Sequence, residues 1–170
     1  MKNITEAPRF KTVMADGVEY LEIAGLLVCK TDLVVPSEHV DGEFVHTDPE
    51  HPEYGQYFSL DAGVIHARYQ GLAVPTPDEW ADILATINPE IGPKGGWQDD
   101  VSVRETLGLK LAGLRYYSPA GFYNQGTHGN YWASSPTGTH GYLVYLSATQ
   151  ALPASNANRA NGFSVRCLKK

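Results

Sequence analysis

The sequence predicts an α+β fold made of short antiparallel strands, two helices and long irregular loops. A chain of 170 residues is long enough to bury a core, and its 17 glycines and 11 prolines favour short strands joined by many turns. The turn signal Ala15-Asp16-Gly17 and a capped helix that begins at Pro77 are the clearest local features. We therefore expect one domain over residues 1–170, with an N-terminal hairpin and helices in 1–110 and a binding region in 111–170.

Charge and hydropathy exclude several classes of partner. The net charge is −6 and there is no stripe of basic residues, so we expect no nucleic-acid partner. No apolar run approaches the ~20 residues that cross a bilayer, so we expect no membrane insertion. The first ten residues, MKNITEAPRF, lack the apolar stretch of a secretory signal. The localisations left open are the cytoplasm, a cell surface reached by another route, and a larger particle such as a phage virion.

The N-terminal part predicts strands. The residues Phe10–Met14 alternate in polarity up to the hairpin turn, and Glu19–Cys29 is rich in strand-forming residues. A further apolar run, Leu33–Val35, stops at Pro36, which cannot continue a strand interior.

A polar stretch over residues Ser37–Tyr57 is typical of a long loop. It contains His39, His46 and His51 among acidic residues, and imidazole with carboxylate suits divalent metals. The spacing matches no ligand motif, however, and solvated loop histidines beside acids are commoner. We therefore expect no metal and no cofactor.

The middle of the chain carries the helices. A short aromatic strand over Tyr54–Leu60 precedes a candidate helix at Asp61–Gln70. Thr76 as N-cap, Pro77 at the first helical position and Glu79 three residues after the cap form a capping box. Apolar residues then recur at helical spacing until Asn88-Pro89 ends the helix; they are Trp80, Ile83, Leu84 and Ile87. We interpret them as core.

A second short helix is expected after the turn at residues 93–96. Asp99 or Asp100 would cap it, and Val103 and Leu107 would share one face. Because Asp99 and Asp100 are adjacent, their side chains point apart and do not form an acid–base pair.

From Leu111 onward the chain contains no acidic residue and is rich in Tyr, Ser, Thr, Asn, His and Gly. Such mixtures are used by binding loops, because Tyr supplies contact area at low entropy cost and small polar residues adapt their hydrogen bonds. The strand candidates here are Tyr131-Trp132, Tyr142–Leu146 and Phe163–Leu168. In the last, alternation predicts Phe163, Val165 and Cys167 inward and Ser164 and Arg166 outward.

Motifs for catalysis are missing. The chain has no GxSxG, HExxH or P-loop, and His128 and His140 lie in the aromatic-polar stretch, where contact residues are as common as catalysts. The two cysteines, Cys29 and Cys167, lie in apolar runs and favour buried free thiols, with a disulfide between the two ends left open. We expect no enzyme activity.

Several segments carry family motifs. AVPTPDEW resembles the LPT-x-x-EW helix start of the formylglycine-generating-enzyme type of C-type lectin fold. ADGVEYLEIAGLLV, YGQYFSLDAG and LAGLRYYSPAGFYNQGTHGNYWASSP resemble the N-terminal hairpin, the following strand and the central motif of Fibrobacter-type major paralogous domains. NRANGFSVRCLKK resembles their ending, GFSVRCVK. The resemblance covers nearly the whole chain and implies a C-type lectin-like fold.

The ending NRANGFSVRC is also similar to that of the variable proteins of diversity-generating retroelements. In that family a reverse transcriptase copies a template repeat with errors at adenines, which scatters Asn codons into many residues. The resemblance implies a non-enzymatic protein that binds a protein or cell-surface receptor through hypervariable side chains. The implied variable, ligand-binding residues are Tyr116, Tyr117, Ser118, Tyr123, Thr127, His128, Thr139, His140, Leu143, Tyr145, Ser147, Gln150, Leu152, Ser155 and Ala157.

Residues between these positions resemble the fixed scaffold of the family: Gly126, Gly129, Asn130, Tyr131, Trp132, Ser134, Ser135, Tyr142, Pro153 and Phe163. Among the variable set, Tyr116, Tyr117, Tyr123 and Tyr145 are the expected aromatic anchors, against the alternative that each is a half-buried core tyrosine. A homo-oligomer is left open, since trimers occur among related phage receptor binders.

The sequence also lacks motifs found in two groups of proteins with the C-type lectin fold. Calcium-dependent lectins use EPN and WND motifs, which are absent here, so calcium-mediated sugar binding is not expected. Two alternatives remain: a surface or adhesin paralogous domain without diversification, and an oxidase of the formylglycine-generating type. The oxidase would need paired cysteines that bind copper, and only Cys29 and Cys167 are present.

Overall fold

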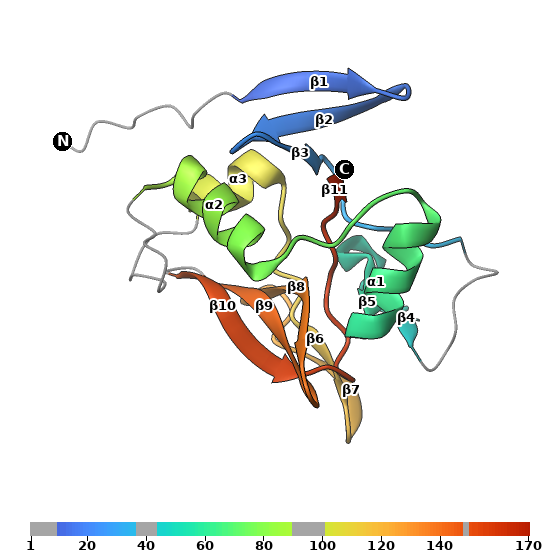
Figure 1. Ribbon diagram of the computed structural model, residues 1–170. Coiled ribbons are helices and arrows are strands. Elements are labelled where there is room, and N and C mark those ends of the chain that lie inside the picture. Colours follow the sequence, from blue (N-terminus) through green and yellow to red (C-terminus); the bar gives the residue numbers. More distant parts are fainter. Residues whose placement is uncertain (1–9, 37–43, 90–100, 148–149) are drawn as a thin grey trace.

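The computed structural model describes residues 10–36, 44–89, 101–147 and 150–170. Within them the chain is a mixed α+β structure of small, mostly antiparallel sheets and three α-helices (Figure 1). The strands are β1 (Lys11–Ala15), β2 (Val18–Ile23), β3 (Leu26–Cys29), β4 (Val45–Thr47), β5 (Gln56–Phe58), β6 (Leu114–Tyr117), β7 (Ala120–Tyr123), β8 (His128–Thr137), β9 (His140–Ser147), β10 (Ala151–Asn158) and β11 (Leu168–Lys169). The helices are α1 (Leu60–Tyr69), α2 (Pro77–Ile87) and α3 (Val101–Leu107), with a 3-10 turn η2 (Pro52–Tyr54).

The N-terminal strands form a sheet in the order β1-β2-β3-β11. The predicted turn at Asp16-Gly17 is present, and both residues have positive φ, at 51° and 77°. A second turn of the same kind, at Ala24-Gly25 with φ of 54° and 73°, divides the run Glu19–Cys29 into two strands. Successive left-handed residues suit two-residue hairpins because their twist matches that of the strands.

Helix α2 begins as predicted. The Thr76 hydroxyl accepts a hydrogen bond from the Glu79 amide at 3.1 Å, and Glu79 Oε2 accepts one from the Thr76 amide at 2.9 Å, which completes the capping box. The four apolar residues at helical spacing are buried, and Nε1 of Trp80 donates to the Trp132 carbonyl at 3.1 Å. These contacts anchor α2 to the central sheet. The helix ends at Asn88, its C-cap.

The other two helices bracket α2 in the sequence. Helix α1, the candidate segment at 61–70, raises the number of α-helices above the expected two; Ser59 caps it by accepting from the Ala62 amide at 3.3 Å. In α3, Val103 and Leu107 are buried as expected. Asp99 and Asp100, the expected caps, lie outside the described residues.

The expected long loop at 37–57 contains secondary structure in its described part. Strand β4 pairs with β5, with Val45 opposite Phe58, and η2 connects them. Val45 and Phe58 are fully buried, so this small sheet is part of the core rather than a solvated loop. His39 lies outside the described residues.

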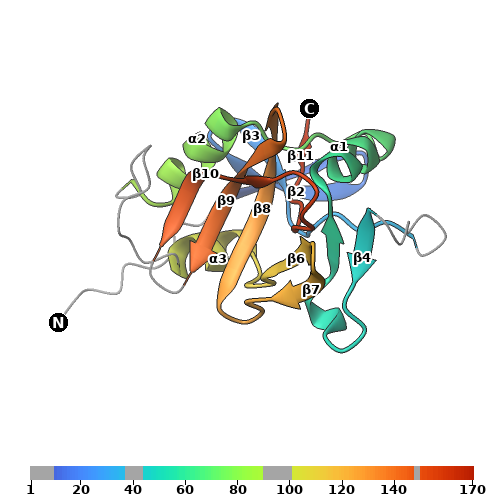
Figure 2. The same cartoon turned by 90° about the horizontal axis from the view of Figure 1, so that it is seen from below.

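The central sheet, in the order β10-β9-β8, lies beneath α2 and α3 (Figures 1 and 2). Tyr131, Val144 and Leu146 belong to the cluster that packs against α2. Trp132 and Leu143 point to the opposite face, because neighbouring residues of a strand alternate between faces. The sheet therefore separates two hydrophobic clusters.

The C-terminal segment, residues 161–168, runs through the middle of the molecule and is buried throughout. It forms isolated bridges, Phe58 with Phe163 and Tyr131 with Ser164, before β11 pairs with β3. The expectation that Ser164 and Arg166 point outward is wrong: the exposed fraction of each is 1%. In-and-out alternation fails because the segment is covered on both sides.

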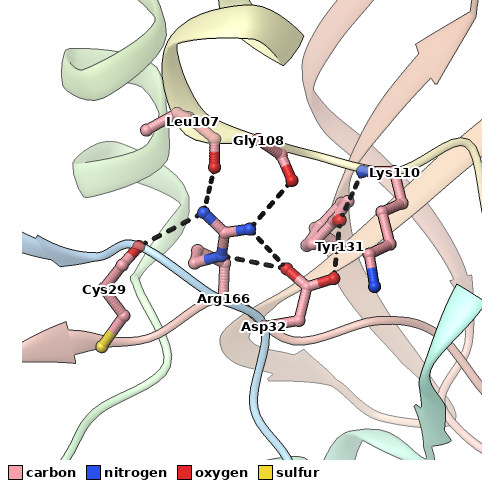
Figure 3. Close-up of polar contacts among 7 residues, drawn as sticks. All are labelled: Cys29, Asp32, Leu107, Gly108, Lys110, Tyr131 and Arg166. Carbon is pink, nitrogen blue, oxygen red and sulfur yellow. Dashed lines mark hydrogen bonds and ion pairs between the residues drawn. The ribbon is translucent and has the colours of Figure 1, made fainter. Parts of the chain in front are cut away.

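Buried Arg166 is bonded by every nitrogen of its guanidinium (Figure 3). Its Nε and Nη2 donate to Oδ1 of Asp32 at 2.9 and 2.7 Å. Nη1 donates to the carbonyls of Cys29 and Leu107, and Nη2 also donates to that of Gly108. Burial of a guanidinium is tolerable only with such full pairing.

The second oxygen of the Asp32 carboxylate extends this network. The Tyr131 hydroxyl donates to Asp32 Oδ2 at 3.0 Å and accepts from the Lys110 amide at 2.8 Å (Figure 3). Burial is the main reason why the pKa of Tyr131 lies well above its usual value. The network thus ties β3, the end of α3, β8 and the C-terminus together.

None of the helices over the described residues is both long and apolar enough to span a bilayer.

Candidate functional site

The hairpin β6–β7 displays three of the predicted anchors. Tyr116, Tyr117 and Tyr123 are 39%, 45% and 46% exposed. The Tyr116 ring lies 5.6 Å from that of Tyr117 and 6.3 Å from that of Tyr123, measured between centroids. Ser118, in the connecting turn, is exposed. The hairpin therefore offers a contiguous aromatic patch to solvent.

The backbone beneath these rings is held by the core. Arg115 and Gly162 exchange two backbone hydrogen bonds at 2.9 and 2.8 Å, and the Tyr117 amide donates to Oδ1 of Asn161 at 3.3 Å. At the other side, the Asn130 amide group donates to the Gly113 carbonyl at 2.9 Å. The hairpin is thus tied both to the C-terminal segment and to β8, which lies beside it in Figure 2.

One end of the central sheet carries a second group of predicted residues. His128 pairs with Ser147, and Tyr145 pairs with Leu152, so all four lie on the face opposite α2. The rings of His128 and Tyr145 are 5.3 Å apart. All four side chains are half-buried, as is Gln150 just before β10. We name this group of five residues the open sheet face.

Toward its other end the same face is closed. Leu143 is only 3% exposed and belongs to the cluster that contains Trp132 and Phe163. Its assignment as a ligand-contact residue is therefore corrected: Leu143 is part of this core cluster, which also contains Leu60 of α1. Ser155, its partner on β10, and Ala157 are half-buried.

Two predicted residues lie apart from the open sheet face. Thr139 and His140 are exposed at the turn between β8 and β9, and His128 lies at the opposite end of the ten-residue β8. At ~3.3 Å per residue, roughly 30 Å separates the two ends. The predicted ligand-binding residues therefore lie at separate places on the molecule and do not form a single site.

His128 and His140 each contact the threonine that precedes them in the sequence. Nδ1 of His128 lies 3.1 Å from the hydroxyl of Thr127, and Nδ1 of His140 lies 3.0 Å from that of Thr139. Thr127 is exposed and its hydroxyl also donates to the Asn124 carbonyl. Each imidazole thus contacts a neutral hydroxyl and not a carboxylate that would orient it as a base.

A polar cluster supports the loop before β8. Gln125 donates to Asp48 Oδ2 at 2.8 Å and to the Tyr57 hydroxyl at 3.0 Å, and Tyr57 donates to the Ala112 carbonyl. The Gln125 hydrogen bond lowers the pKa of Asp48, whereas burial raises the pKa of Tyr57 to about 12. The cluster is satisfied internally and positions the chain that leads to His128.

In the described parts of the chain, no group of three or more His, Cys, Asp or Glu side chains is arranged so that it could hold a metal ion. His51 pairs with Glu53 at 3.1 Å. Asp48, the buried acid nearby in sequence, is bonded to Gln125. The described histidines of the 37–57 stretch thus show no shared ligand geometry.

Sequence reasoning missed a groove of about 930 Å³ next to the hairpin. It is lined by Phe44, Asp61, Arg115, Tyr117 and Arg159, among others. These residues come from segments far apart in the sequence, and only Tyr117 was predicted to bind. The one available signal was Arg115, which is the only cation between Leu111 and Asn158.

Comparison of the chain with protein-family models, with curated proteins and with solved structures found no match. The function must therefore be inferred from the surface itself.

Proposed function

We propose that this protein is a non-enzymatic receptor-recognition protein on a C-type lectin-like fold, whose binding surface is diversified by a retroelement. The surface comprises the tyrosines of hairpin β6–β7 and the open sheet face. Its ligand is a protein or a cell-surface receptor.

The observation that carries this proposal is the exposed ring cluster of Tyr116, Tyr117 and Tyr123 on a hairpin whose backbone is bonded to the core. Rigid aromatic side chains lose little entropy on binding, and a few such anchors dominate the energy of most interfaces. Neighbouring exposed rings form an apolar patch, and such patches mark interaction sites more often than single exposed residues do.

The division between surface and core supports a diversifiable design. The expected scaffold residues Tyr131, Trp132 and Phe163 are buried, whereas most of the implied variable positions are exposed or half-buried. Exposed positions away from special features tolerate substitution within about 0.5 kcal/mol. Diversification of these positions would therefore leave the fold intact, with Leu143 as the exception.

The oxidase alternative is disfavoured by the cysteines. Burial raises the pKa of Cys29, and it raises that of Cys167 to about 12. Cys167 is buried, so its sulfur is closed to a copper ion from solvent. Both cysteines are free thiols in this structure.

The deciding experiment is genomic. If the proposal is right, the DNA that flanks the gene encodes a reverse transcriptase and a second copy of the 3′ coding segment that differs from it only at adenines. The adenines should fall in the codons of the variable set, Tyr116 and Tyr145 among them, and not in those of Tyr131 or Trp132. Flanking DNA that lacks both elements would leave an undiversified surface or adhesin domain as the better interpretation.

A further inference from the structure

The groove beside the hairpin contains an arginine, Arg115, that no described residue neutralises. The backbone of Arg115 is fixed by its two hydrogen bonds with Gly162, at 2.9 and 2.8 Å. Its side chain is half-buried and lines the groove, but its guanidinium forms no hydrogen bond or ion pair with any residue that the structure describes. The backbone of Arg115 is therefore held in place, while the N–H groups of its guanidinium remain available to a ligand.

Arg159 lies in the same groove and is only partly satisfied. It pairs with Asp61, and its Nη1 donates to the Gly138 carbonyl at 3.0 Å. Its Nε is buried and has no partner among the described groups. Because this atom is shielded from solvent, Arg159 adds positive charge to the groove, and the N–H donors that a ligand can reach are those of Arg115.

The groove is cationic on an acidic protein. Among the described lining residues, two arginines accompany one carboxylate, Asp61, whereas the whole chain carries a net charge of −6. A concave site with low-dielectric walls concentrates such a local field and attracts an anion. Because Asp61 offsets one of the two cations, a group with a single negative charge fits better than a doubly charged phosphate.

Apolar walls accompany this charge. Phe44 and Ile65 both line the groove and are about half exposed, so their apolar surface is available to a ligand. Sites with apolar walls and a few fixed polar groups are typical of ligand pockets, and the volume of about 930 Å³ is in their usual range.

We propose that this groove binds an acidic side chain of a protein partner, with its carboxylate on the guanidinium of Arg115 and a neighbouring apolar side chain against Phe44 and Ile65. Arginine forks match carboxylates in geometry, which gives such a contact direction as well as energy. The inference stands apart from the proposed diversification, because Tyr117 is the only residue shared by the groove and the implied variable set.

The test uses the full chain, labelled with ¹⁵N, and three probes. The first is a blocked tripeptide of leucine, glutamate and leucine; the second replaces its glutamate with glutamine; the third is phenyl phosphate. We expect the glutamate peptide alone to shift the Nε–H resonances of Arg115 and Arg159 and the amide of Ala62, with saturation below about 10 mM. Arg115→Met should weaken its binding by roughly tenfold or more, since it removes a charge-assisted hydrogen bond.

Arg68→Met is the matched control, because Arg68 is exposed on α1 and does not line the groove; this variant should bind like the parent. If Arg115→Met does not fold, Arg115→Lys retains the charge without the fork and should show an intermediate loss. Equal binding of the glutamine peptide, an unaffected Arg115→Met, or no shift with the glutamate peptide at that concentration overturns the proposal. Tighter binding of phenyl phosphate overturns the assignment to a carboxylate. None of these results depends on whether the gene has a template repeat.

Discussion

Asp32, just after β3, holds Arg166 of the C-terminal segment through two hydrogen bonds to a single oxygen, Oδ1, at 2.9 and 2.7 Å. The two residues are 134 positions apart in the sequence, and Arg166 is fully enclosed. Nη1 donates to the carbonyls of Cys29 on β3 and Leu107 at the end of α3, and Nη2 also donates to the carbonyl of Gly108. The pair therefore locks the C-terminus into the centre of the fold.

Breaking this pair should destabilise the protein severely. Asp32→Asn leaves the buried guanidinium without a counter-charge, and removal of one partner of a buried ion pair costs about 3–5 kcal/mol. The measurement is the free energy of unfolding from urea denaturation. Lys30→Gln is the control, because its ion pair with Glu19 is exposed and should contribute less than about 1 kcal/mol. An Asp32→Asn protein as stable as the parent would contradict the assigned role.

The exposed tyrosines should matter little for stability. Tyr116→Ala and Tyr123→Ala each remove a half-exposed ring and one or two ring contacts, which predicts a loss of about 1 kcal/mol or less. Thermal and urea unfolding give the values. Losses above about 3 kcal/mol would mean that these rings are structural, and would remove the main support for a recognition role.

Leu143 should behave in the opposite way. It was expected on the surface but is buried beside Trp132 and Phe163, so Leu143→Ala should cost about 2–5 kcal/mol through lost transfer energy and a cavity. Leu152→Ala, on the half-buried part of the same sheet face, is the matched comparison and should cost clearly less. Similar losses for both would show that the two ends of this face are equally covered.

The capping box of α2 predicts that the free energy of unfolding depends on pH. Burial raises the pKa of Glu79, but hydrogen bonds from Lys170 and Thr76 outweigh it, so the pKa in the folded protein lies below its usual value. A depressed folded-state pKa contributes stability that is complete above the unfolded value and is lost as pH falls through the folded value. Unfolding free energies measured between pH 6 and 3 should therefore fall more steeply for the parent than for Glu79→Gln. Parallel curves would contradict this contribution.

Removal of the cap hydroxyl tests the same motif at neutral pH. Thr76→Ala should lower the free energy of unfolding by about 1 kcal/mol, because the Glu79 amide loses its acceptor. Thr76→Ser keeps the hydroxyl and should remain close to the parent. Equal losses in the two variants would assign the effect to the methyl group and not to the cap.

The thiols should resist alkylation in the folded state. Burial raises the pKa of Cys29 and raises that of Cys167 to about 12, so few thiolates exist near pH 8. Mass spectrometry after iodoacetamide treatment should show unlabelled Cys167 and slow labelling of half-buried Cys29, with both labelled rapidly in urea. Rapid labelling of Cys167 in native buffer would contradict its burial.

Local features were predictable because neighbouring residues produce them. The turn at Asp16-Gly17 and the capping box at Thr76 and Glu79 depend on contacts within a few positions, and both appear as predicted. The turn at Ala24-Gly25 was missed because alanine rarely adopts the left-handed conformation, so no sequence signal marked it.

The candidate surface was predictable only in part. The composition of residues 111–170 indicated recognition, and the tyrosines of the hairpin are exposed. Nothing in the local sequence could show that Leu143 is buried and Tyr145 half-buried, because the two residues lie on the same face of one strand, two positions apart. Their difference depends on distant segments that pack around Leu143, among them those that contain Leu60 and Phe163.

The sequence by itself determined the hairpin turn, the start of α2 and the presence of an aromatic-polar surface, because each depends on nearby residues or on composition. Only the tertiary structure decided that Arg166 is buried, that Leu143 belongs to the core and that Arg115 faces a groove. Those outcomes depend on which distant segments cover a side chain or supply its partner. Burial and ion pairing across more than a hundred residues are properties of the packed chain, and a linear pattern does not contain them.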